Sequence, residues 1–588
     1  MNIYAGLEAD SYKHVHGALQ KFTVPFDENK TIALTCGKND RAAVQLLLYS
    51  EQEMLVNVNG DCSFYEKGPI DNVRIAVEAP GLQGGTATVN LIGLIEDDDR
   101  QLKADILLRQ AAIHVEGRRV QPVWIEVAIG KDAKPGIYTP RISVYGQRMF
   151  ADEQLIRELT FEIRVLDTTL KDVKDYSFNL DLWQHNSNIA RKYDVALWTD
   201  EHFAIMENYI ASLADLGQKA LTVIVTEIPW SGQASSYDRI DPANMFEYNI
   251  VRTTRLANGE WSFDFSALNR YVELGMKHGI TQEIEVFGLI NIWVLEDVGF
   301  GGVLEDHNDA VRVRYWDEST RSYKYMRRKA DFELYVQALQ RNFIERGWID
   351  LVRVIADEPA DLPVFKARLD ALRQMAPSFK YKAAINHSNF IEQQIEGMTD
   401  YVPVLNCIAH EFEHIKKLKT EIKGSMNYYV CCGPDFPNTF IRSHLLESRL
   451  IPWLAYYMNM DGFLRWNYTV WPNDPLRKIS YHAPIFPAGD TNFVYPGKDG
   501  KPLLTLRYKL LQKGIRDYEI IRSSVENGGN REQLEQEFKR VFLWEHLSEL
   551  HPESRKRKEE LFSLNDADYE EIITGILARI ASAAPAER

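Results

Sequence analysis

The sequence predicts a β-sandwich domain followed by a (β/α)8 TIM barrel. Up to about Asp167, short runs of β-branched and apolar residues alternate with turn residues, which is typical of a sandwich. After Tyr176, buried strands alternate with amphipathic helices in eight units, which is typical of the barrel. We therefore expect a sandwich over residues 1–168, a barrel over 169–525, and a helical extension over 526–588 that packs on the barrel.

The sandwich prediction depends on runs rich in Val, Ile, Leu and aromatic residues, which are the residue types that strands favour. These runs are residues 31–35, 42–49, 73–77, 124–129 and 159–166. A Pro-Gly turn at residues 135–136 joins two of the runs, as in a module that packs beside a larger domain. No constellation of catalytic residue types is visible in this half.

The barrel prediction depends on eight buried strands and the helices between them. The strands are expected at residues 178–184, 220–230, 283–291, 351–358, 381–387, 401–406, 425–432 and 462–470. The helices are expected at residues 202–216, 265–278, 332–346, 362–375, 390–396, 411–423, 438–458 and 503–524. Because (β/α)8 barrels carry their active sites at the carboxyl ends of the strands, side chains there are the candidates for function.

Composition limits the classes of partner. The 588 residues are 45% hydrophobic and 26% charged, which fits folded globular domains. The formal net charge of -16 argues against nucleic acid, since phosphate backbones are bound by basic surfaces. The short basic run at residues 555–558 lies among glutamates and is typical of a solvated helix face. A neutral glycan remains compatible with this charge.

The cysteines and the amino terminus indicate a reducing compartment. Five cysteines at irregular spacing do not form a disulfide framework or a paired metal clip. Cys431 and Cys432 are expected to be reduced, because adjacent residues of a strand point to opposite faces. No signal peptide and no stretch of transmembrane length is visible, so we expect a cytoplasmic protein without membrane insertion, or a secreted one if a signal has been removed. No feature predicts a cofactor or an oligomeric state.

The most informative motif is Asp357-Glu358-Pro359, which closes the fourth predicted strand. The residues before it are β-branched and apolar, and the proline cannot continue the ladder. Two adjacent, poorly hydrated carboxylates repel, so one is expected to hold a proton while the other stays charged. Taken alone, the tripeptide would more often be a surface turn. Its place at the mouth of a barrel favours acid/base chemistry instead.

Other predicted strand ends carry groups that suit a sugar. Aromatic faces pack against the C–H faces of a pyranose, and amides and imidazoles bond to its hydroxyls. For each aromatic residue alone, packing in the barrel core is the commoner role, so the argument depends on their shared location. The candidates are Trp183, Trp230, Asn386, His387, Tyr429, Trp466 and Tyr468.

With these motifs the chain resembles glycoside hydrolase family 123 and related uncharacterised barrel proteins. The resemblance covers roughly residues 1–525 and is most specific in residues 355–359, 427–434, 449–453, 461–466 and 508–518. It implies a β-N-acetylgalactosaminidase whose nucleophile is the substrate's own 2-acetamido group. Glu358 would then protonate the glycosidic oxygen and activate water, and Asp357 would orient and stabilise the acetamido group. The implied partner is a glycan with a terminal β-linked N-acetylhexosamine, and no metal or other cofactor is implied.

Three alternatives remain open. His410-Glu-Phe-Glu-His414 matches the H-E-x-x-H pattern of zinc proteases, although here we expect it to straddle a loop and the first helical turn after the sixth strand. A second alternative is a barrel that binds glycans without catalysis, since fold alone does not specify chemistry. The third is a β-N-acetylglucosaminidase or a hydrolase of a modified amino sugar, because the position of one hydroxyl separates these substrates.

Overall fold

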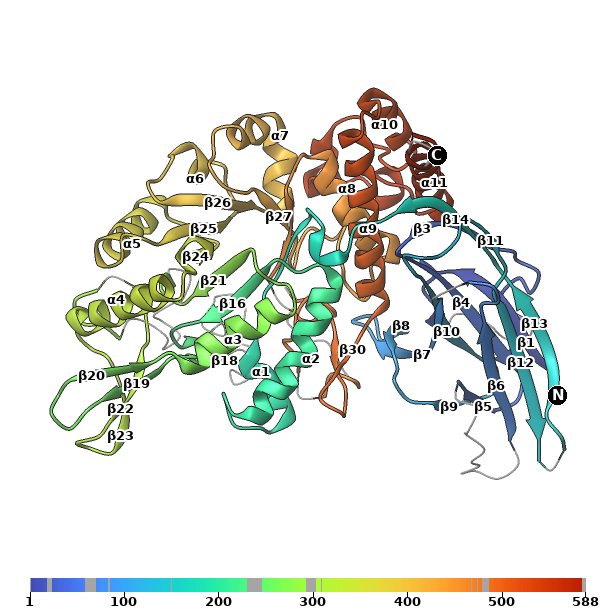
Figure 1. Ribbon diagram of the computed structural model, residues 1–588, viewed down its shortest axis with the longest axis horizontal. Helices are drawn as coiled ribbons and strands as arrows, with labels where there is room; N and C mark the ends of the chain where they lie inside the picture. Colours follow the sequence, from blue (N-terminus) through green and yellow to red (C-terminus); the bar gives the residue numbers. More distant parts are fainter. Residues whose placement is uncertain are drawn as a thin grey trace.

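The computed structural model has a β-rich amino-terminal half and a half in which strands and helices alternate (Figure 1). The structure describes residues 2–17, 24–58, 70–82, 85–149, 151–229, 246–291, 303–307, 309–466, 468–472, 474–477 and 486–583. Within these residues, no helix is long and apolar enough to span a membrane.

The amino-terminal half is rich in sheets. A six-stranded sheet has the order β1-β4-β10-β7-β8-β2, a five-stranded sheet β13-β12-β6-β5-β9, and a three-stranded sheet β11-β14-β3. The strands are β1 (Ile3–Ala9), β2 (Val15–His16), β3 (Ala33–Lys38), β4 (Asp40–Ser50), β5 (Met54–Asn57), β6 (Asp71–Glu78), β7 (Thr86–Glu96), β8 (Leu102–Leu107), β9 (Ala112–Val115), β10 (Arg119–Ile129), β11 (Gly136–Tyr138), β12 (Arg141–Arg148), β13 (Gln154–Thr160) and β14 (Glu162–Thr169).

Alternating side chains of these sheets fill one common core. Along β12, Ile142 and Val144 are buried while their neighbours are more exposed, as the two-residue period of a strand requires. They share a cluster with Val44 of β4 and Val123 of β10. The sheets therefore stabilise one another by burying a shared apolar layer.

The second half contains eight parallel strands whose pairing returns to its starting point. They are β15 (Asn179–Leu182), β16 (Ala220–Ile224), β21 (Glu283–Phe287), β24 (Val352–Asp357), β25 (Lys380–Ile385), β26 (Met398–Pro403), β27 (Asn427–Tyr429) and β28 (Gly462–Arg465). Five pair in the order β16-β21-β24-β25-β26 and three in the order β15-β28-β27. Parallel bridges between Leu180 and Gln218, and between Tyr401 and Met426, join the two groups. We call this closed arrangement the strand ring.

Helices connect and cover the strand ring. They are α1 (Asn186–Tyr193), α2 (Asp200–Leu216), α3 (Ser266–Lys277), α4 (Lys329–Glu345), α5 (Leu362–Met375), α6 (Asn389–Glu392), α7 (Leu405–Lys419), α8 (Leu445–Tyr457) and α9 (Leu506–Glu526). The cap residues Thr199, Asp361 and Thr505 accept hydrogen bonds from backbone N–H groups in the first turns of α2, α5 and α9. These caps satisfy donors that have no partner within the helix.

Short strands interrupt two of the connections between the ring strands. A four-stranded sheet has the order β20-β19-β22-β23, and β17 and β18, like β29 and β30, form small pairs. Their bounds are β17 (Ile228–Pro229), β18 (Phe246–Glu247), β19 (Arg252–Arg255), β20 (Trp261–Asp264), β22 (Arg314–Asp317), β23 (Ser322–Tyr325), β29 (Tyr495–Pro496) and β30 (Pro502–Leu503).

Three predicted helix boundaries are wrong by four residues or more. Helix α7 begins at Leu405 rather than at residue 411, because residues 405–410, part of which was assigned to the sixth strand, form its first turns. Helix α8 begins at Leu445 rather than at 438, after two X-Pro bonds that end at Pro437 and a capping box between His444 and Glu447. Helix α6 ends at Glu392 and so is shorter than the predicted 390–396.

The carboxyl-terminal segment packs against both halves. Helix α10 (Arg531–Phe538) contributes Phe538, whose ring lies 5.6 Å from that of Trp453 in α8. Helix α11 (Asp566–Ala583) contributes Tyr569, whose ring lies 5.3 Å from the same tryptophan. Helix α11 also contacts α9, β3 and β14, so the extension touches the amino-terminal sheets as well as the strand-ring half.

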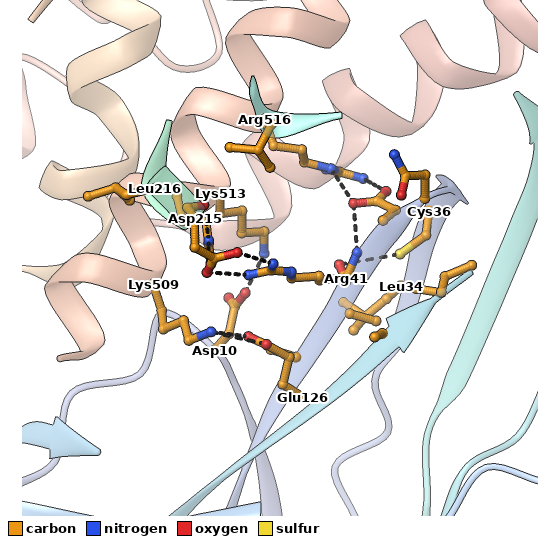
Figure 2. Close-up of a pocket in the computed structure, with 18 of the residues that line it drawn as sticks. Asp10, Leu34, Cys36, Arg41, Glu126, Asp215, Leu216, Lys509, Lys513 and Arg516 are labelled. Carbon is orange, nitrogen blue, oxygen red and sulfur yellow. Dashed lines mark hydrogen bonds and ion pairs between the residues drawn. The ribbon is translucent and has the colours of Figure 1, made fainter. Parts of the chain in front are cut away.

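A stripe of basic side chains on α9 joins the two halves. Lys509, Lys513 and Arg516 lie at helical positions i, i+4 and i+7 and so share one face. Each pairs with a carboxylate of the amino-terminal half, namely Glu126, Asp10 and Asp40 respectively. Figure 2 shows these side chains around a cavity of about 370 Å³ between the two halves. We call this set the α9 stripe.

We expect Asp40→Ala to destabilise the fold strongly. Arg516 is 8% exposed and makes two contacts with the Asp40 carboxylate, of 3.0 and 2.5 Å. Removing Asp40 leaves the buried guanidinium with Asp517 as its remaining contact, which costs about 3 kcal/mol of unfolding free energy. Urea denaturation measures this loss. Glu273→Ala, which breaks the exposed pair with Arg346, is the control, and its effect should stay below about 1 kcal/mol. Equal losses in both variants would contradict the role of the α9 stripe.

Candidate active site

The acid pair lies at the carboxyl end of β24, as the sequence predicts. Asp357 is the last residue of the strand, pairs with Ala384 of β25 and is 9% exposed. Glu358 is partly exposed, and its backbone N–H donates to the Ala384 carbonyl at 3.1 Å. Its φ of 47° lies in the left-handed region, which is costly for a residue with a side chain and is found most often at functional sites. The backbone turn directs the two neighbouring carboxylates differently.

A buried tyrosine holds the Glu358 carboxylate. The Tyr429 hydroxyl, at the end of β27, donates to Glu358 Oε1 and also lies 2.8 Å from Asn386 Oδ1. A phenol carries one proton, so these two oxygens compete for it. Burial raises the pKa of Tyr429 well above its usual value, and the charge of Glu358 raises it further. Tyr429 is therefore a neutral donor that fixes the position of the glutamate.

Trp466, which directly follows β28, is held by a second carboxylate. Its indole Nε1 donates to Asp490 Oδ1 at 3.3 Å, and Arg465 donates to the same oxygen at 2.9 Å. Burial raises the pKa of Asp490 to about 6, against the lowering effects of Arg465 and the Trp466 N–H, and the charge of Glu358 adds to the rise. The Trp466 ring is half-buried and packs against Phe486, with ring centroids 5.4 Å apart.

Asn386 and His387 follow β25 and line a cavity with Glu358. Both side chains are exposed, and the cavity has a volume of about 440 Å³. Strand ends therefore bring Asp357, Glu358, Asn386 and Tyr429 together. A carboxyl group beside a cavity lined by amide and imidazole groups can exchange a proton with a bound polar ligand.

The structure places two other predicted aromatic residues in packed surroundings. Trp183 is 1% exposed, and its ring meets that of Phe287 edge-to-face at 4.6 Å. Tyr468 is also 1% exposed, and its hydroxyl bonds to Ser212 Oγ of α2 at 2.8 Å. Burial of both rings argues against stacking on a sugar. Contact of these two residues with substrate is untested and stays a prediction. Trp230 lies outside the described residues.

Several further polar residues lie at these strand ends that were not among the predicted site residues. After β15, the five polar residues at positions 184–188 are all buried, and His185 donates through Nε2 to the Trp466 carbonyl at 3.1 Å. A polar run directly after an apolar strand was a visible signal for them. Asp490 lies far from any ring strand in the sequence, so no local pattern could have identified it.

The His410–His414 segment is helical, contrary to the expectation of a loop and first turn. It lies within α7, where Glu411 has a non-helical φ of -124° and ψ of 32°. The kink disrupts the regular i, i+4 geometry that places two histidines on one metal. His414 Nε2 instead lies 2.6 Å from Glu392 Oε1. Among the described residues, this segment does not supply three side chains close enough to share an ion.

Cys431 and Cys432 are free thiols, but the expectation that they lie on one strand and point to opposite faces is wrong. Strand β27 ends at Tyr429, so the cysteines lie beyond it and do not alternate between faces. Their sulfur atoms lie 3.8 Å apart on the wall of the cavity that contains Glu358.

Three carboxylates inside the strand ring surround an ammonium group. Asp181, Glu283 and Glu285 lie close enough together to share a metal ion. Lys382 Nζ already contacts them at 2.5, 2.9 and 3.0 Å. Burial raises the pKa of Glu285 well above its usual value, and the Asp181 charge adds to this effect. The Lys382 ammonium occupies the position that a metal ion would take among the three carboxylates. These four residues therefore form a buried polar core inside the strand ring.

Comparison with protein families identifies the chain. Residues 183–524 match the family described as Glycoside hydrolase 123, catalytic domain, and residues 20–146 match the Glycoside hydrolase 123 N-terminal domain. The protein belongs to glycoside hydrolase family 123. It is therefore an enzyme that hydrolyses glycosidic bonds, and the predicted resemblance is confirmed.

A solved structure of a family 123 enzyme shares this fold over nearly the whole chain. A family 123 glycoside hydrolase from Clostridium perfringens, described in terms of glycolipid glycan hydrolysis, has a TM-score of 0.69 at 17% identity. The alignment covers 99% of this chain and 98% of that one. A putative glycoside hydrolase from Bacteroides vulgatus has a TM-score of 0.30 at 11% identity, covering 84% and 78% of the two chains. A comparison with curated proteins found no match.

We expect Tyr429→Phe to impair this glycoside hydrolase without unfolding it. The ring is retained, but Glu358 and Asn386 lose their shared donor. A lost hydrogen bond to a charged group costs about 1.5–3 kcal/mol, which corresponds to a fall of roughly 10- to 150-fold in kcat/KM. Steady-state kinetics of both proteins, with a substrate that the wild type cleaves, measure this fall in kcat/KM. Circular dichroism checks that the variant is folded. Unchanged kinetics would show that Tyr429 does not hold the acid.

We expect the buried His202, in the first turn of α2, to make the free energy of unfolding depend on pH. His202 accepts the Trp198 N–H at Nδ1 and contacts the Asn186 carbonyl through Nε2, at 3.1 and 3.0 Å. Burial lowers its pKa to about 4 from 6.5. The stability it contributes is therefore complete above pH 6.5 and is lost as pH falls toward 4, by about 3 kcal/mol.

The comparison of wild type with His202→Gln isolates this effect from other titrating groups. Urea midpoints at pH 7 and pH 4.5 should show a large gap between the two proteins at pH 7 and a small one at pH 4.5. A gap independent of pH would contradict the assignment.

Proposed function

We propose that this family-123 enzyme removes non-reducing terminal β-linked N-acetylgalactosamine by a retaining, substrate-assisted mechanism. The observation that carries the proposal is the adjacency of Asp357 and Glu358 at the end of β24, where Glu358 bonds to Tyr429 and lines the cavity while Asp357 is buried at the strand end. Two different environments for neighbouring carboxylates support two different roles. A β-N-acetylglucosaminidase, or a hydrolase of a modified amino sugar, is the alternative within the same chemistry.

In the first step, Glu358 donates its proton to the glycosidic oxygen as that bond breaks. The carbonyl oxygen of the 2-acetamido group attacks the anomeric carbon, and the leaving sugar departs with the proton. Asp357 accepts a hydrogen bond from the acetamido N–H and stabilises the positive charge of the oxazolinium ion. Because the nucleophile is part of the substrate, neither carboxylate has to reach the anomeric carbon.

In the second step, Glu358 acts as a base. It takes a proton from a water molecule, whose oxygen attacks the anomeric carbon and reopens the ring of the intermediate. The acetamido group is restored, the β configuration is retained, and Glu358 is again protonated. Tyr429 keeps the carboxylate in place for both transfers, and Trp466 offers a half-buried aromatic face for the sugar.

We also propose that residues 169–525 form a (β/α)8 barrel and residues 1–168 a β-sandwich, with residues 526–588 as an extension. The cyclic order of parallel pairing supports the barrel. The shared core between the amino-terminal sheets supports the sandwich.

We expect Glu358→Gln to reduce kcat/KM for 4-nitrophenyl β-N-acetylgalactosaminide about 10²- to 10⁴-fold, because the acid/base group is lost. Asp357→Asn should impair the same substrate, and a thiazoline analogue of the intermediate should inhibit the wild type strongly. The matched β-N-acetylglucosaminide tests the alternative specificity. A glycosyl group trapped covalently on a carboxylate of the protein would overturn the substrate-assisted mechanism.

A further inference from the structure

Two adjoining cavities lie beside α7, and one of them contains Glu358 in its wall. The inner cavity, of about 440 Å³, contains Glu358 in its wall, and the outer cavity has a volume of about 930 Å³. Both are lined by His387, His410 and Glu411, so they adjoin at these three residues. We call the two together the α7 groove. Volumes of this size accommodate extended ligands rather than single ions.

The groove starts at only one member of the acid pair. Glu358 lines the inner cavity, whereas Asp357 and Trp466 line neither cavity. In the proposed function, Asp357 holds the acetamido group of the sugar that is removed, and Glu358 meets the glycosidic oxygen. The part of the substrate beyond that oxygen therefore begins where the groove begins.

The kink in α7 shapes one wall of the groove. The non-helical backbone at Glu411 interrupts the helix between His410 and Phe412, and all three side chains line the outer cavity. His414 and Glu392 pair across α7 and α6 farther along the same wall. The segment that resembles a zinc motif thus lines a groove with imidazole and carboxylate groups.

The carboxyl-terminal extension forms the opposite wall. His551 lines the inner cavity, and its ring lies 5.6 Å from that of His410. Residues 545–548 line the outer cavity. The Tyr457 ring lies between Phe412, which it faces at 6.4 Å with an interplanar angle of 13°, and Trp544 at 5.6 Å. Aromatic faces beside imidazole, carboxylate and amide groups are the chemistry that binds saccharides.

We propose that the α7 groove binds the leaving-group saccharide of an oligosaccharide substrate, with the extension as its outer wall. This inference rests on the proposed function, because it is Glu358 that fixes where the leaving group begins. It makes the enzyme selective for glycans whose leaving group is longer than one sugar. His410 and His551 are then residues that determine specificity and not catalytic residues.

The test compares two substrates that share the terminal sugar. One is 4-nitrophenyl β-N-acetylgalactosaminide, whose leaving group has no sugar, and the other is a tetrasaccharide with a terminal β-N-acetylgalactosamine. The double variant His410→Ala/His551→Ala should lower kcat/KM for the tetrasaccharide about tenfold and that for the aryl glycoside less than about twofold. Lys417→Ala, an exposed change on α7 outside both cavities, is the matched control and should alter neither.

A binding measurement separates the groove from the chemistry. The free leaving-group trisaccharide should bind the wild type in calorimetry and bind the double variant about tenfold more weakly. Thermal melting checks that the double variant is folded. His410→Trp, whose larger side chain fills the groove, should also lower kcat/KM for the tetrasaccharide more than for the aryl glycoside. Equal losses on both substrates, or equal trisaccharide binding in both proteins, would overturn the inference.

If the wild type cleaves neither substrate, the proposed terminal sugar is wrong, and the trisaccharide result alone decides whether the groove binds saccharide. Weaker binding to the double variant would then still support the groove, and unchanged binding would overturn it.

Discussion

Closure of the strand ring is the constraint on which the site depends. Strand β28 pairs with β15, so backbone hydrogen bonds join segments that are about 280 residues apart in the chain. All eight strands are parallel, and their carboxyl ends therefore open on the same side. Tyr429 of β27 lies three strands from Glu358 along the order β24-β25-β26-β27, and the curvature of the ring brings the two side chains within hydrogen-bonding distance. The site is a property of the ring rather than of any one segment.

The conformation of Glu358 shows how two adjacent acids become different. A left-handed residue costs about 1–3 kcal/mol and persists only where its surroundings hold it. Here the Ala384 carbonyl holds the backbone and Tyr429 holds the side chain, while Asp357 stays in the strand. The strain is compatible with a group that must meet a substrate in a fixed position.

Much of the fold could be predicted because it follows from local periodicity. The eight buried runs, the acid pair at a strand end, and the placement of Asn386 beside Glu358 need only the strand pattern and the rule that barrel strands end at one mouth. The kink at Glu411 could not be predicted, because nothing in the local sequence forbids a regular helix there. Asp490 could not be predicted either, since its partner Trp466 is brought to it by tertiary packing.

The α9 stripe has a consequence for how this enzyme can be divided. Lys509, Lys513 and Arg516 belong to the helix that follows the last ring strand, yet the carboxylates opposite them belong to the amino-terminal sheets. A fragment that began at β15 would lose one carboxylate partner for each of these three cations. Lys513 would keep Glu570 and Arg516 would keep Asp517, but the carboxylates of the amino-terminal sheets would be missing from an otherwise buried face. The amino-terminal sheets are therefore a structural part of the hydrolase, and not a detachable accessory module.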